Sequence, residues 1–241
     1  MSAPPCCGRP INYRTPPKHR PPTALQRTAD TRPFSVAERR RRLAYRSPAS
    51  AGANRLLAVA DLEQFAWPPS PIQTERLVLR ESQPQDRPVV IELFASPDVC
   101  GYIGGPRPRD ELERVVPDVP ARRPGVFVVA LNGTMIGFVE INRRDEGRPG
   151  HLRAGAGEAE LSYMFLPAAW GRGYATEACA AVLDWFARTR PDEPVVLCTQ
   201  TANSASMRLA ATLGFTEVDR FQEFGAEQWF GVRSSVAPSG S

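Results

Sequence analysis

Hydrophobic and polar residues follow a regular pattern along the chain beyond about residue 72, and the period of this pattern predicts the secondary structure. Residues 74–80 alternate with a period of two, which is typical of a half-buried strand. The same reading predicts strands at 126–131, 135–141, 158–166, 195–200, 216–221 and 228–232. Asn132-Gly133 stands between two of these strands, and this dipeptide supplies the positive φ angles of a type I′ hairpin turn.

Helices are expected where apolar residues recur every three or four positions. These segments are 84–95, 110–116, 173–189 and 203–213. Gly214 directly follows the last of them and is a natural C′ residue that ends the helix. The order of strands and helices predicts an α/β domain with a mixed sheet.

The first 70 residues differ in composition from the rest of the chain. They hold 12 of the 30 basic residues, 4 of the 26 acidic residues and 11 of the 25 prolines. Such a segment cannot bury enough apolar surface to offset chain entropy. We therefore expect a disordered Pro/Arg-rich extension at 1–70, a folded domain at 72–233 and a flexible tail at 234–241. A short helix at 35–45 would carry the Arg39–Arg42 run. This run could contact nucleic acid or anionic lipid. We expect instead that it is part of a solvated leader.

The remaining charges and the cysteines exclude several classes of function. Beyond residue 70 the chain has 18 basic and 22 acidic residues, so we expect no nucleic-acid partner for the folded domain. The five cysteines show no CxxC spacing, and we expect no metal site and no disulfide framework. Neither a secretory signal nor a membrane span is evident, so the expected location is the cytoplasm, without a membrane partner.

A strand, a glycine-rich turn and a helix start follow one another at residues 159–178. Gly171 and Gly173 suit a backbone that must approach an anion closely, since a Cβ atom would block the approach. We expect the backbone N–H groups from Gly171 to Ala175 to hold a phosphate group. The alternative is a tight turn without a ligand. A Rossmann dinucleotide site is disfavoured because the full G-x-G-x-x-G pattern is absent.

Asn203 and Ser206 stand at the start of the last predicted helix, directly after a buried strand. Taken alone, they are an N-cap residue and a residue of the first helical turn. The same position beside a strand end also faces a cofactor crevice in α/β sheets. Behind a phosphate-binding turn, the second interpretation gains weight.

Two motifs together resemble the GNAT superfamily of acetyl-CoA-dependent N-acetyltransferases. They are Trp170-Gly-Arg-Gly-Tyr-Ala-Thr-Glu-Ala178 and Asn203-x-x-Ser206-x-Arg208-Leu209-x-x-x-Leu213-Gly214-Phe215. The segment Thr74–Arg80 is similar to the branch that contains ribosomal-protein alanine N-acetyltransferases. The resemblance covers about residues 72–233. It implies a GNAT fold, with a mixed, mostly antiparallel central sheet flanked by helices.

The resemblance implies acetyl-CoA as the co-substrate. Gly173 and Ala175 match the last two fixed places of the family's phosphate motif, whereas Trp170 stands where Gln or Arg is usual. Asn203 is expected to hydrogen-bond the pantetheine arm, and Ser206 to lie near the thiol. The residues expected to bind the cofactor are Met164, Phe165, Gly171, Arg172, Gly173, Tyr174, Ala175, Thr176, Asn203 and Ser206.

Amine acetylation requires a general base, because a typical amine is protonated at pH 7 and must lose a proton to attack. Glu160 stands where this branch carries a glutamate and is the leading candidate. Glu158 is its substitute, and Glu140 is a more distant one. The alternative interpretation of Glu160 is a strand-face carboxylate that pairs with an arginine.

The resemblance leaves the general acid open. Many family members place a tyrosine four residues before the glycine of the Gly-Phe pair, and this chain has Ala210 there. The leaving thiolate is then protonated by Ser206 or by a water molecule, or it departs directly without a general acid. The oxyanion donor is expected to be a backbone N–H near Met164 or Phe165. Glu160 and Ser206 are therefore the predicted catalytic residues.

The expected reaction transfers an acetyl group from acetyl-CoA to a primary amine by direct attack. An acetyl-enzyme is disfavoured because Cys179 and Cys198 lie in apolar helix and strand contexts. The acceptor is either a protein N-terminus or a small-molecule amine, and the protein is a monomer or a homodimer. The alternatives are a non-catalytic acyl-CoA sensor or interaction module, and a chain whose activity resides in its arginine-rich tail.

Acceptor recognition is expected at the loop around Tyr102 and at the aromatic-rich end of the domain. The aromatic residues in question are Phe221, Phe224, Trp229 and Phe230. Aromatic residues on closing strands more often belong to the core than to a binding site. We therefore expect most of these four residues to be core and some to line a substrate pocket. His151 lies in a polar loop and is expected to be exposed to solvent.

Overall fold

The computed structural model describes residues 70–120, 122–153 and 157–234. The helix expected at 35–45 lies outside these residues, as do nearly all of the predicted extension and C-terminal tail. Among the described residues, no helix combines the length and apolar character needed to cross a membrane.

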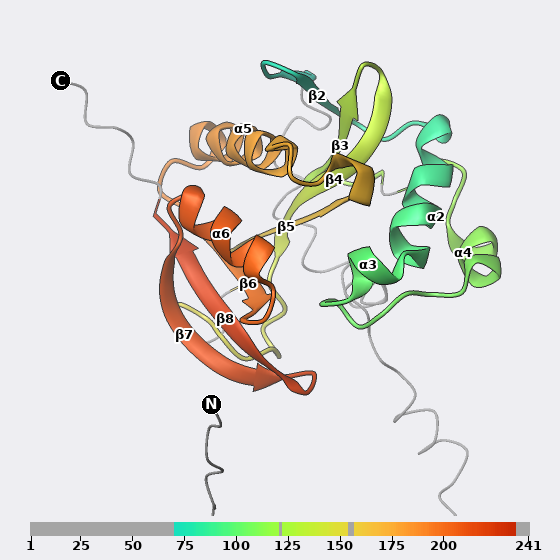
Figure 1. The fold of residues 1–241 in the computed structure, drawn as a ribbon. Coiled ribbons are helices and arrows are strands. Elements are labelled where there is room, and N and C mark those ends of the chain that lie inside the picture. Colours follow the sequence, from blue (N-terminus) through green and yellow to red (C-terminus); the bar gives the residue numbers. More distant parts are fainter. Residues whose placement is uncertain (1–69, 121, 154–156, 235–241) are drawn as a thin grey trace, which may run out of the picture. The chain divides into compact units, whose positions relative to one another are not determined.

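The centre of the fold is an eight-stranded sheet with the order β1-β2-β3-β4-β5-β6-β8-β7 (Figure 1). The strands are β1 (Ile72–Gln73), β2 (Leu77–Arg80), β3 (Val126–Leu131), β4 (Thr134–Arg143), β5 (Ala159–Phe165), β6 (Val195–Gln200), β7 (Thr216–Glu223) and β8 (Ala226–Arg233). Every pair of neighbours is antiparallel except β5 and β6, which run parallel. The predicted mixed, mostly antiparallel sheet is confirmed.

Helices cover both faces of this sheet. They are η2 (Pro84–Asp86), α2 (Arg87–Ala95), α3 (Pro97–Cys100), α4 (Arg109–Val115), η3 (Pro167–Ala169), α5 (Tyr174–Thr189) and α6 (Ser204–Thr212). Figure 1 shows α5 and α6 on one side of the sheet and α2, α3 and α4 on the other. The resulting layers are those of an α/β domain with the sheet in the middle.

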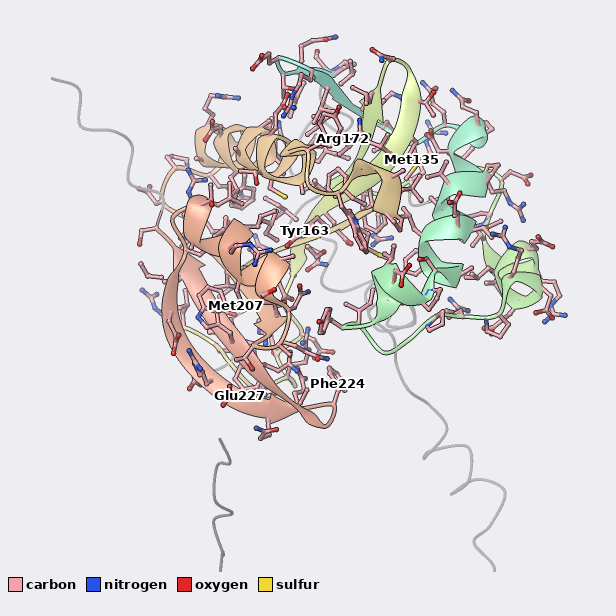
Figure 2. The ribbon with its side chains drawn as sticks, in the orientation of Figure 1. Met135, Tyr163, Arg172, Met207, Phe224 and Glu227 are labelled. Carbon is pink, nitrogen blue, oxygen red and sulfur yellow. The ribbon has the colours of Figure 1, made fainter. Side chains whose placement is uncertain are left out.

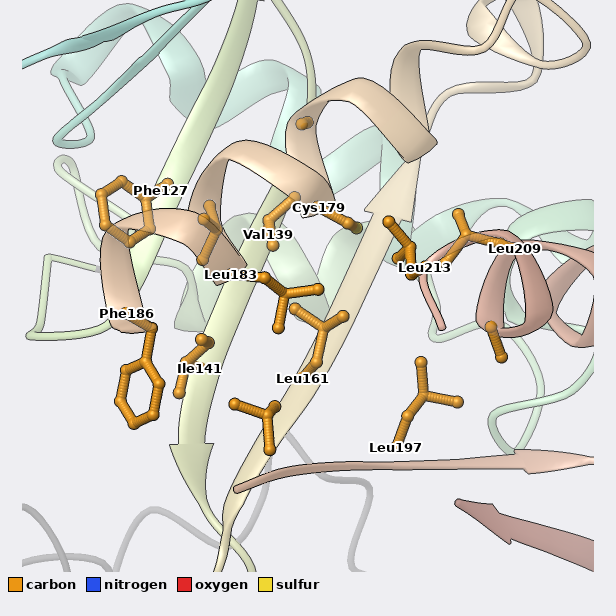
Figure 3. Packing of buried hydrophobic residues seen from close by; sticks show 14 of the residues in the cluster. Phe127, Val139, Ile141, Leu161, Cys179, Leu183, Phe186, Leu197, Leu209 and Leu213 are labelled. Carbon is orange, nitrogen blue, oxygen red and sulfur yellow. The ribbon is translucent and has the colours of Figure 1, made fainter. Parts of the chain in front are cut away.

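The larger apolar cluster lies between the sheet and the pair α5 and α6 (Figure 3). Leu161 of β5, Leu183 of α5 and Leu209 of α6 are all buried in it. Each fully buried leucine contributes about 1.5–3 kcal/mol of transfer free energy. Met164 packs instead with the smaller cluster beneath α2. Since side chains alternate across a strand, Glu160 also points to the face opposite α5 and α6.

Two comparisons with the predicted elements are instructive. The hairpin between β3 and β4 is confirmed, with φ angles of 50° at Asn132 and 82° at Gly133. The strand predicted at 74–80 begins only at Leu77, because Thr74 and Arg76 lie in the turn between β1 and β2 and bond to a helix instead. The short helix α3 was missed by the sequence analysis.

Candidate functional site

The parallel strands β5 and β6 pair only at their first residues. The register joins Ala159 to Val195 and Glu160 to Val196, and no further pair of these two strands is formed. Strand β6 then pairs along its whole length with β8. The two strands therefore diverge beyond Glu160, as Figure 1 shows, and one edge of β5 is left without a strand partner. We call the space beside this edge the strand gap.

The backbone of β5 directs specific polar groups toward the strand gap. The N–H of Leu166 donates to the carbonyl of Ile136 on β4 at 2.9 Å. Because successive residues point their backbone groups to opposite edges of a strand, the N–H of Phe165 points away from β4. The N–H of Met164 points toward β4. Of the two backbone donors expected from the sequence, the structure thus turns only Phe165 toward the strand gap.

The glycine turn lies directly after η3 and leads into α5. Gly171 and Gly173 have φ angles of 71° and 78°, in the left-handed region that favours glycine. Gly173 is the N-cap of α5, so the first N–H groups of the helix have no partner within it. Within the described part of the chain, no backbone N–H from Gly171 to Thr176 donates a hydrogen bond. These donors and the positive end of the helix dipole together form an anion-binding geometry.

The turn between β1 and β2 holds the start of α5 in place. The Thr74 hydroxyl and the Arg76 backbone N–H donate to Glu177 Oε1 at 2.6 and 2.9 Å. Arg76 Nε donates to Glu177 Oε2 at 2.7 Å, and its Nη1 donates to the carbonyl of Arg172 at 2.9 Å. Burial alone would raise the pKa of Glu177, but the hydrogen bonds from Thr74 and Arg76 outweigh it and lower the pKa. A guanidinium is thereby placed beside the glycine turn.

The start of α6 faces the same strand gap from the other side. Asn203 Oδ1 accepts a hydrogen bond from the Ser206 backbone N–H at 3.2 Å, which is a side-chain N-cap. This bond uses the oxygen of the Asn203 amide and leaves its Nδ2 hydrogens for another acceptor. The Ser206 hydroxyl oxygen lies 2.7 Å from the hydroxyl oxygen of Tyr163 on β5. This pair of hydroxyl groups therefore joins β5 to α6 at the strand gap.

Tyr163 was not singled out by the sequence analysis. Figure 2 shows it between β5 and the helices α5 and α6. Burial raises the pKa of Tyr163 to about 12, against the opposite effect of its hydrogen bond with Ser206. Its hydroxyl therefore stays protonated at neutral pH. The signal that could have found it is the alternation of β5, which puts Tyr163 on the α6 side with a polar tip.

Glu160 pairs with two arginines of the loop that joins β4 to β5. The Arg144 side chain has no exposed surface and pairs with Glu160 Oε1, while it also donates to the carbonyls of Pro149 and Gly150, both at 2.6 Å. Arg148 Nη1 lies 3.7 Å from Glu160 Oε2, beyond hydrogen-bond distance. The pairing with arginine, which the sequence analysis gave as the alternative, is present. Oε2 nevertheless accepts no hydrogen bond from a described residue.

The other candidate carboxylates are more fully engaged. Glu158 Oε2 lies 2.7 Å from His151 Nδ1, and its Oε1 accepts from the Leu152 backbone N–H at 2.6 Å. Burial acts to raise the pKa of Glu158, but these hydrogen bonds outweigh it and the pKa is lowered. Glu140 pairs with Arg123 at 2.6 Å. The expectation of a solvent-exposed His151 is wrong: its side chain is 13% exposed, because it packs against Glu158.

Neither Cys179 nor Cys198 offers a nucleophilic thiol. Cys179 is buried within α5, and burial raises its pKa. Cys198 on β6 lies near the pair formed by Arg144 and Glu160, and burial raises its pKa although the arginine acts to lower it. A thiol with a raised pKa is a poor nucleophile near neutrality. In the described ranges, no group of three His, Cys, Asp or Glu side chains is arranged to hold a metal ion.

The predicted aromatic end divides into core and surface residues. Trp229 and Phe230 are buried, and Phe221 is half-buried with its ring 6.4 Å from that of Phe230. Phe224 is 61% exposed at the tip of the hairpin between β7 and β8. It has a φ of 55°, which is rare for a bulky residue. Of these four residues, Phe224 is thus the one presented at the surface, and Figure 2 shows its position near the end of the hairpin.

The loop predicted to recognise the acceptor lies near the end of β6. Tyr102 is 43% exposed, and its carbonyl accepts a hydrogen bond from Gln200 Nε2 at 3.1 Å. Gln200 is the last residue of β6 and shares a strand face with Cys198. The loop therefore reaches the same face as Glu160.

Comparisons with known proteins bear on the family and the fold of the chain. The family described as acetyltransferase (GNAT) domain matches residues 76–216. Among solved structures, a GNAT-family acetyltransferase from Bacillus anthracis is 20% identical with a TM-score of 0.55, and the match covers 68% of this chain and 98% of that one. A ribosomal L7/L12 alpha-N-protein acetyltransferase is 15% identical with a TM-score of 0.52, and the match covers 68% of this chain and 94% of that one. An aminoglycoside acetyltransferase in complex with coenzyme A is 16% identical with a TM-score of 0.52, and the match covers 66% of this chain and 94% of that one. At these identities the structural similarity establishes the fold.

Proposed function

The chain belongs to the GNAT acetyltransferase family, and we propose that it transfers the acetyl group of acetyl-CoA to a primary amine by direct attack. One observation carries this proposal. The unpartnered N–H groups of the glycine turn, the open edge of β5 and the hydroxyl of Ser206 all border the strand gap. A ligand with an anionic end, an amide-containing arm and a thioester fits these three features in that order.

The glycine turn supports a phosphate site. We infer that backbone N–H groups of Gly171, Arg172, Gly173, Tyr174, Ala175 and Thr176 hold the pyrophosphate of acetyl-CoA. No side chain is needed for this contact, so Trp170 in place of the usual Gln or Arg does not weaken it. The Arg76 guanidinium beside the turn adds positive charge, although its pairing with Glu177 reduces the effect.

The pantetheine arm fits the open edge of β5. A strand edge with unpaired N–H and C=O groups needs a hydrogen-bonding partner, and the two amides of pantetheine supply one. The Nδ2 hydrogens of Asn203 are available to the same arm, because its oxygen already caps α6. This placement would bring the thioester close to Ser206, which is also what the resemblance to the family implies.

Glu160 is our proposed general base. Its Oε2 accepts no hydrogen bond from a described residue, whereas both oxygens of Glu158 are engaged. It lies at the point where β5 and β6 begin to diverge, on the face opposite α5 and α6. We infer that Oε2 takes the proton of the acceptor ammonium, directly or through one water molecule.

The reaction then proceeds by addition and elimination. The amine nitrogen attacks the carbonyl carbon, a C–N bond forms, and the carbonyl oxygen becomes an oxyanion. The Phe165 N–H is the proposed donor to this oxyanion, because it points toward the strand gap and the Met164 N–H does not. The attacking nitrogen then loses its second proton to solvent. Collapse of the intermediate breaks the C–S bond, and the electron pair leaves with the coenzyme A sulfur.

The acceptor is a protein N-terminus or a small amine. The similarity of Thr74–Arg80 to ribosomal-protein acetyltransferases favours a protein N-terminus. Similar folds in the solved structures serve both a ribosomal-protein and an aminoglycoside acetyltransferase, so the fold alone does not decide. We place acceptor recognition at Phe224 and the Tyr102 loop, in a domain of residues 72–233 that works in the cytoplasm.

The proposal is tested by thiol release from acetyl-CoA with a panel of N-terminal peptides and small primary amines. Calorimetry with acetyl-CoA runs beside it. Binding together with turnover of one acceptor class is the expected result. Tight binding without turnover on any acceptor would favour a sensor, which would also be consistent with the arginine pairing of Glu160. Absence of binding would overturn the site itself.

A further inference from the structure

Two hydroxyl groups from distant parts of the sequence meet at the strand gap. Tyr163 belongs to β5 and Ser206 to α6, and their oxygen atoms are 2.7 Å apart. Together they carry two protons, of which one lies in their mutual hydrogen bond. Neither hydroxyl has another hydrogen-bond partner among the described residues. One proton of the pair is therefore available to whatever group enters the gap.

The surroundings hold this pair in one place. Ser206 is buried, and Ala210 follows one helical turn later on the same face of α6 without exposed surface. Tyr163 packs against the apolar cluster that contains Ala210. The tyrosine hydroxyl thus reaches the gap from β5, and the Ser206 hydroxyl reaches it from α6.

We propose that Tyr163 is a positioning residue that orients the Ser206 hydroxyl, so that the pair donates a hydrogen bond to the coenzyme A sulfur as it departs. This inference rests on the proposed function, because it presupposes that the thioester lies beside Ser206. It adds a residue that the sequence motifs do not contain.

The chemistry calls for a donor of this kind. When the C–S bond breaks, its electron pair moves to sulfur, and a thiol with a pKa of about 8.5 is a modest leaving group. A hydrogen bond to the developing anion is stronger than one between neutral groups. Because burial raises the pKa of Tyr163 to about 12, the pair keeps its own protons and acts as a neutral donor. The thiolate leaves with its hydrogen bond and takes a proton from solvent after release.

The direct test is the pKa of the thiol of bound coenzyme A. It is read from the ultraviolet absorbance of the thiolate, with desulfo-coenzyme A as the reference ligand. In the wild type we expect this pKa to lie below that of free coenzyme A. Tyr163→Phe and Ser206→Ala should each raise it by about one pH unit, the size expected for one hydrogen bond to a charged group. An unchanged thiol pKa in Tyr163→Phe would overturn the inference.

Kinetics separate positioning from a structural role. We expect kcat to fall about 10-fold in Tyr163→Phe and in Ser206→Ala, while KM for acetyl-CoA stays within about 2-fold. The double variant should be no slower than either single one, because the two residues act as a unit. Losses that multiply in the double variant would contradict the inference.

The chain offers a matched control and a safeguard against misfolding. Ser204→Ala removes an exposed hydroxyl from the same helix and should leave kcat and the thiol pKa unchanged. Ser206→Ala keeps the N-cap bond, because Asn203 accepts from the backbone N–H of residue 206. If the wild type does not bind coenzyme A, the proposed function fails. If it binds and turns over while Tyr163→Phe behaves as the wild type, only this inference fails.

Discussion

The two sides of the strand gap are built in different ways. The donor side consists of the glycine turn and the start of α6, which are short continuous segments that work mainly through backbone groups and one N-cap. The acceptor side consists of side chains from distant segments. Arg144 and Arg148 come from the loop after β4, Glu160 from β5, and Glu223 from β7, where it accepts from Arg148 at 2.8 Å.

This difference separates what the two sides do. In the function we propose, a cradle of backbone groups binds the invariant part of acetyl-CoA and tolerates changes in neighbouring side chains. A network of side chains on the opposite face then sets which amine can approach and how its proton leaves. Substitutions on the donor side should therefore change acetyl-CoA affinity, and those on the acceptor side should change turnover and acceptor preference.

The largest effect is expected from Glu160→Gln on the acceptor side. Loss of the general base should lower kcat by about 10²–10⁴-fold. The amide oxygen still accepts from Arg144, so the dissociation constant for acetyl-CoA should change by no more than about 2-fold. Stopped-time thiol release and calorimetry measure the two quantities. Glu158→Gln is the matched control and should retain kcat; equal losses in both variants would remove Glu160 from its role.

On the donor side, Gly173→Ala is expected to weaken the binding of acetyl-CoA rather than to lower kcat. The residue has a φ of 78°, and an added Cβ would disturb the N–H groups that face the anion. Acetyl-CoA should bind about 10- to 100-fold more weakly, as expected for the loss of one charge-assisted hydrogen bond. Gly214→Ala introduces a Cβ at the same φ with nothing within 4 Å and serves as the control for strain. Equal weakening in both variants would contradict the comparison.

An acceptor-side effect of moderate size is expected from Phe224→Asn. The turns Asn132-Gly133 and Phe224-Gly225 share nearly the same φ angles, but only the first has the residue that this geometry favours. The exchange should raise the free energy of unfolding by about 1 kcal/mol and raise KM for the acceptor about 5-fold.

Thermal unfolding and acceptor titration check this prediction. The reverse substitution in the other turn, Asn132→Phe, is the control. It should lower the free energy of unfolding by a similar amount without any change in KM for the acceptor. A Phe224→Asn variant with wild-type KM would show that the exposed ring has no part in acceptor recognition.

The smallest effect concerns the contact between the β1–β2 turn and Glu177. Since the pKa of Glu177 is lowered in the folded state, its stabilising contribution is present above the unfolded pKa of 4.5 and is lost as pH falls below that value. Glu177→Gln should therefore lower the free energy of unfolding by about 1 kcal/mol at pH 7 and by much less near pH 3. Urea titrations at both values measure this. Glu75→Gln, at an exposed carboxylate of the same turn, serves as the control substitution.

Local signals predicted most of the fold and the donor side. The Asn132-Gly133 turn, the cap at Asn203 and the glycines before α5 act through their own backbone geometry, so a short segment contains the whole signal. The pairing of Glu160 could be stated only as an alternative, because its partner Arg144 is buried by loop carbonyls that no local pattern predicts. Arginine is usually found at the protein surface, so nothing in the sequence indicates that Arg144 is buried.

Tyr163 escaped the sequence analysis for a related reason. Its partner Ser206 lies 43 positions away, and their contact exists only because β5 and α6 pack on the same cluster. The burial of His151 was likewise hidden, since it depends on Glu158 rather than on the polar loop around it. The sequence predicts most helices and strands, but it does not predict the side-chain contacts between them.

The measurement that tests the central claim most directly is amide hydrogen exchange of the wild-type chain with and without acetyl-CoA. The account predicts slower exchange at the N–H groups from Gly171 to Thr176 and along the open edge of β5, with little change at the β7–β8 hairpin. Protection confined to other segments, or no protection at the glycine turn at saturating acetyl-CoA, would contradict the assignment of the donor side.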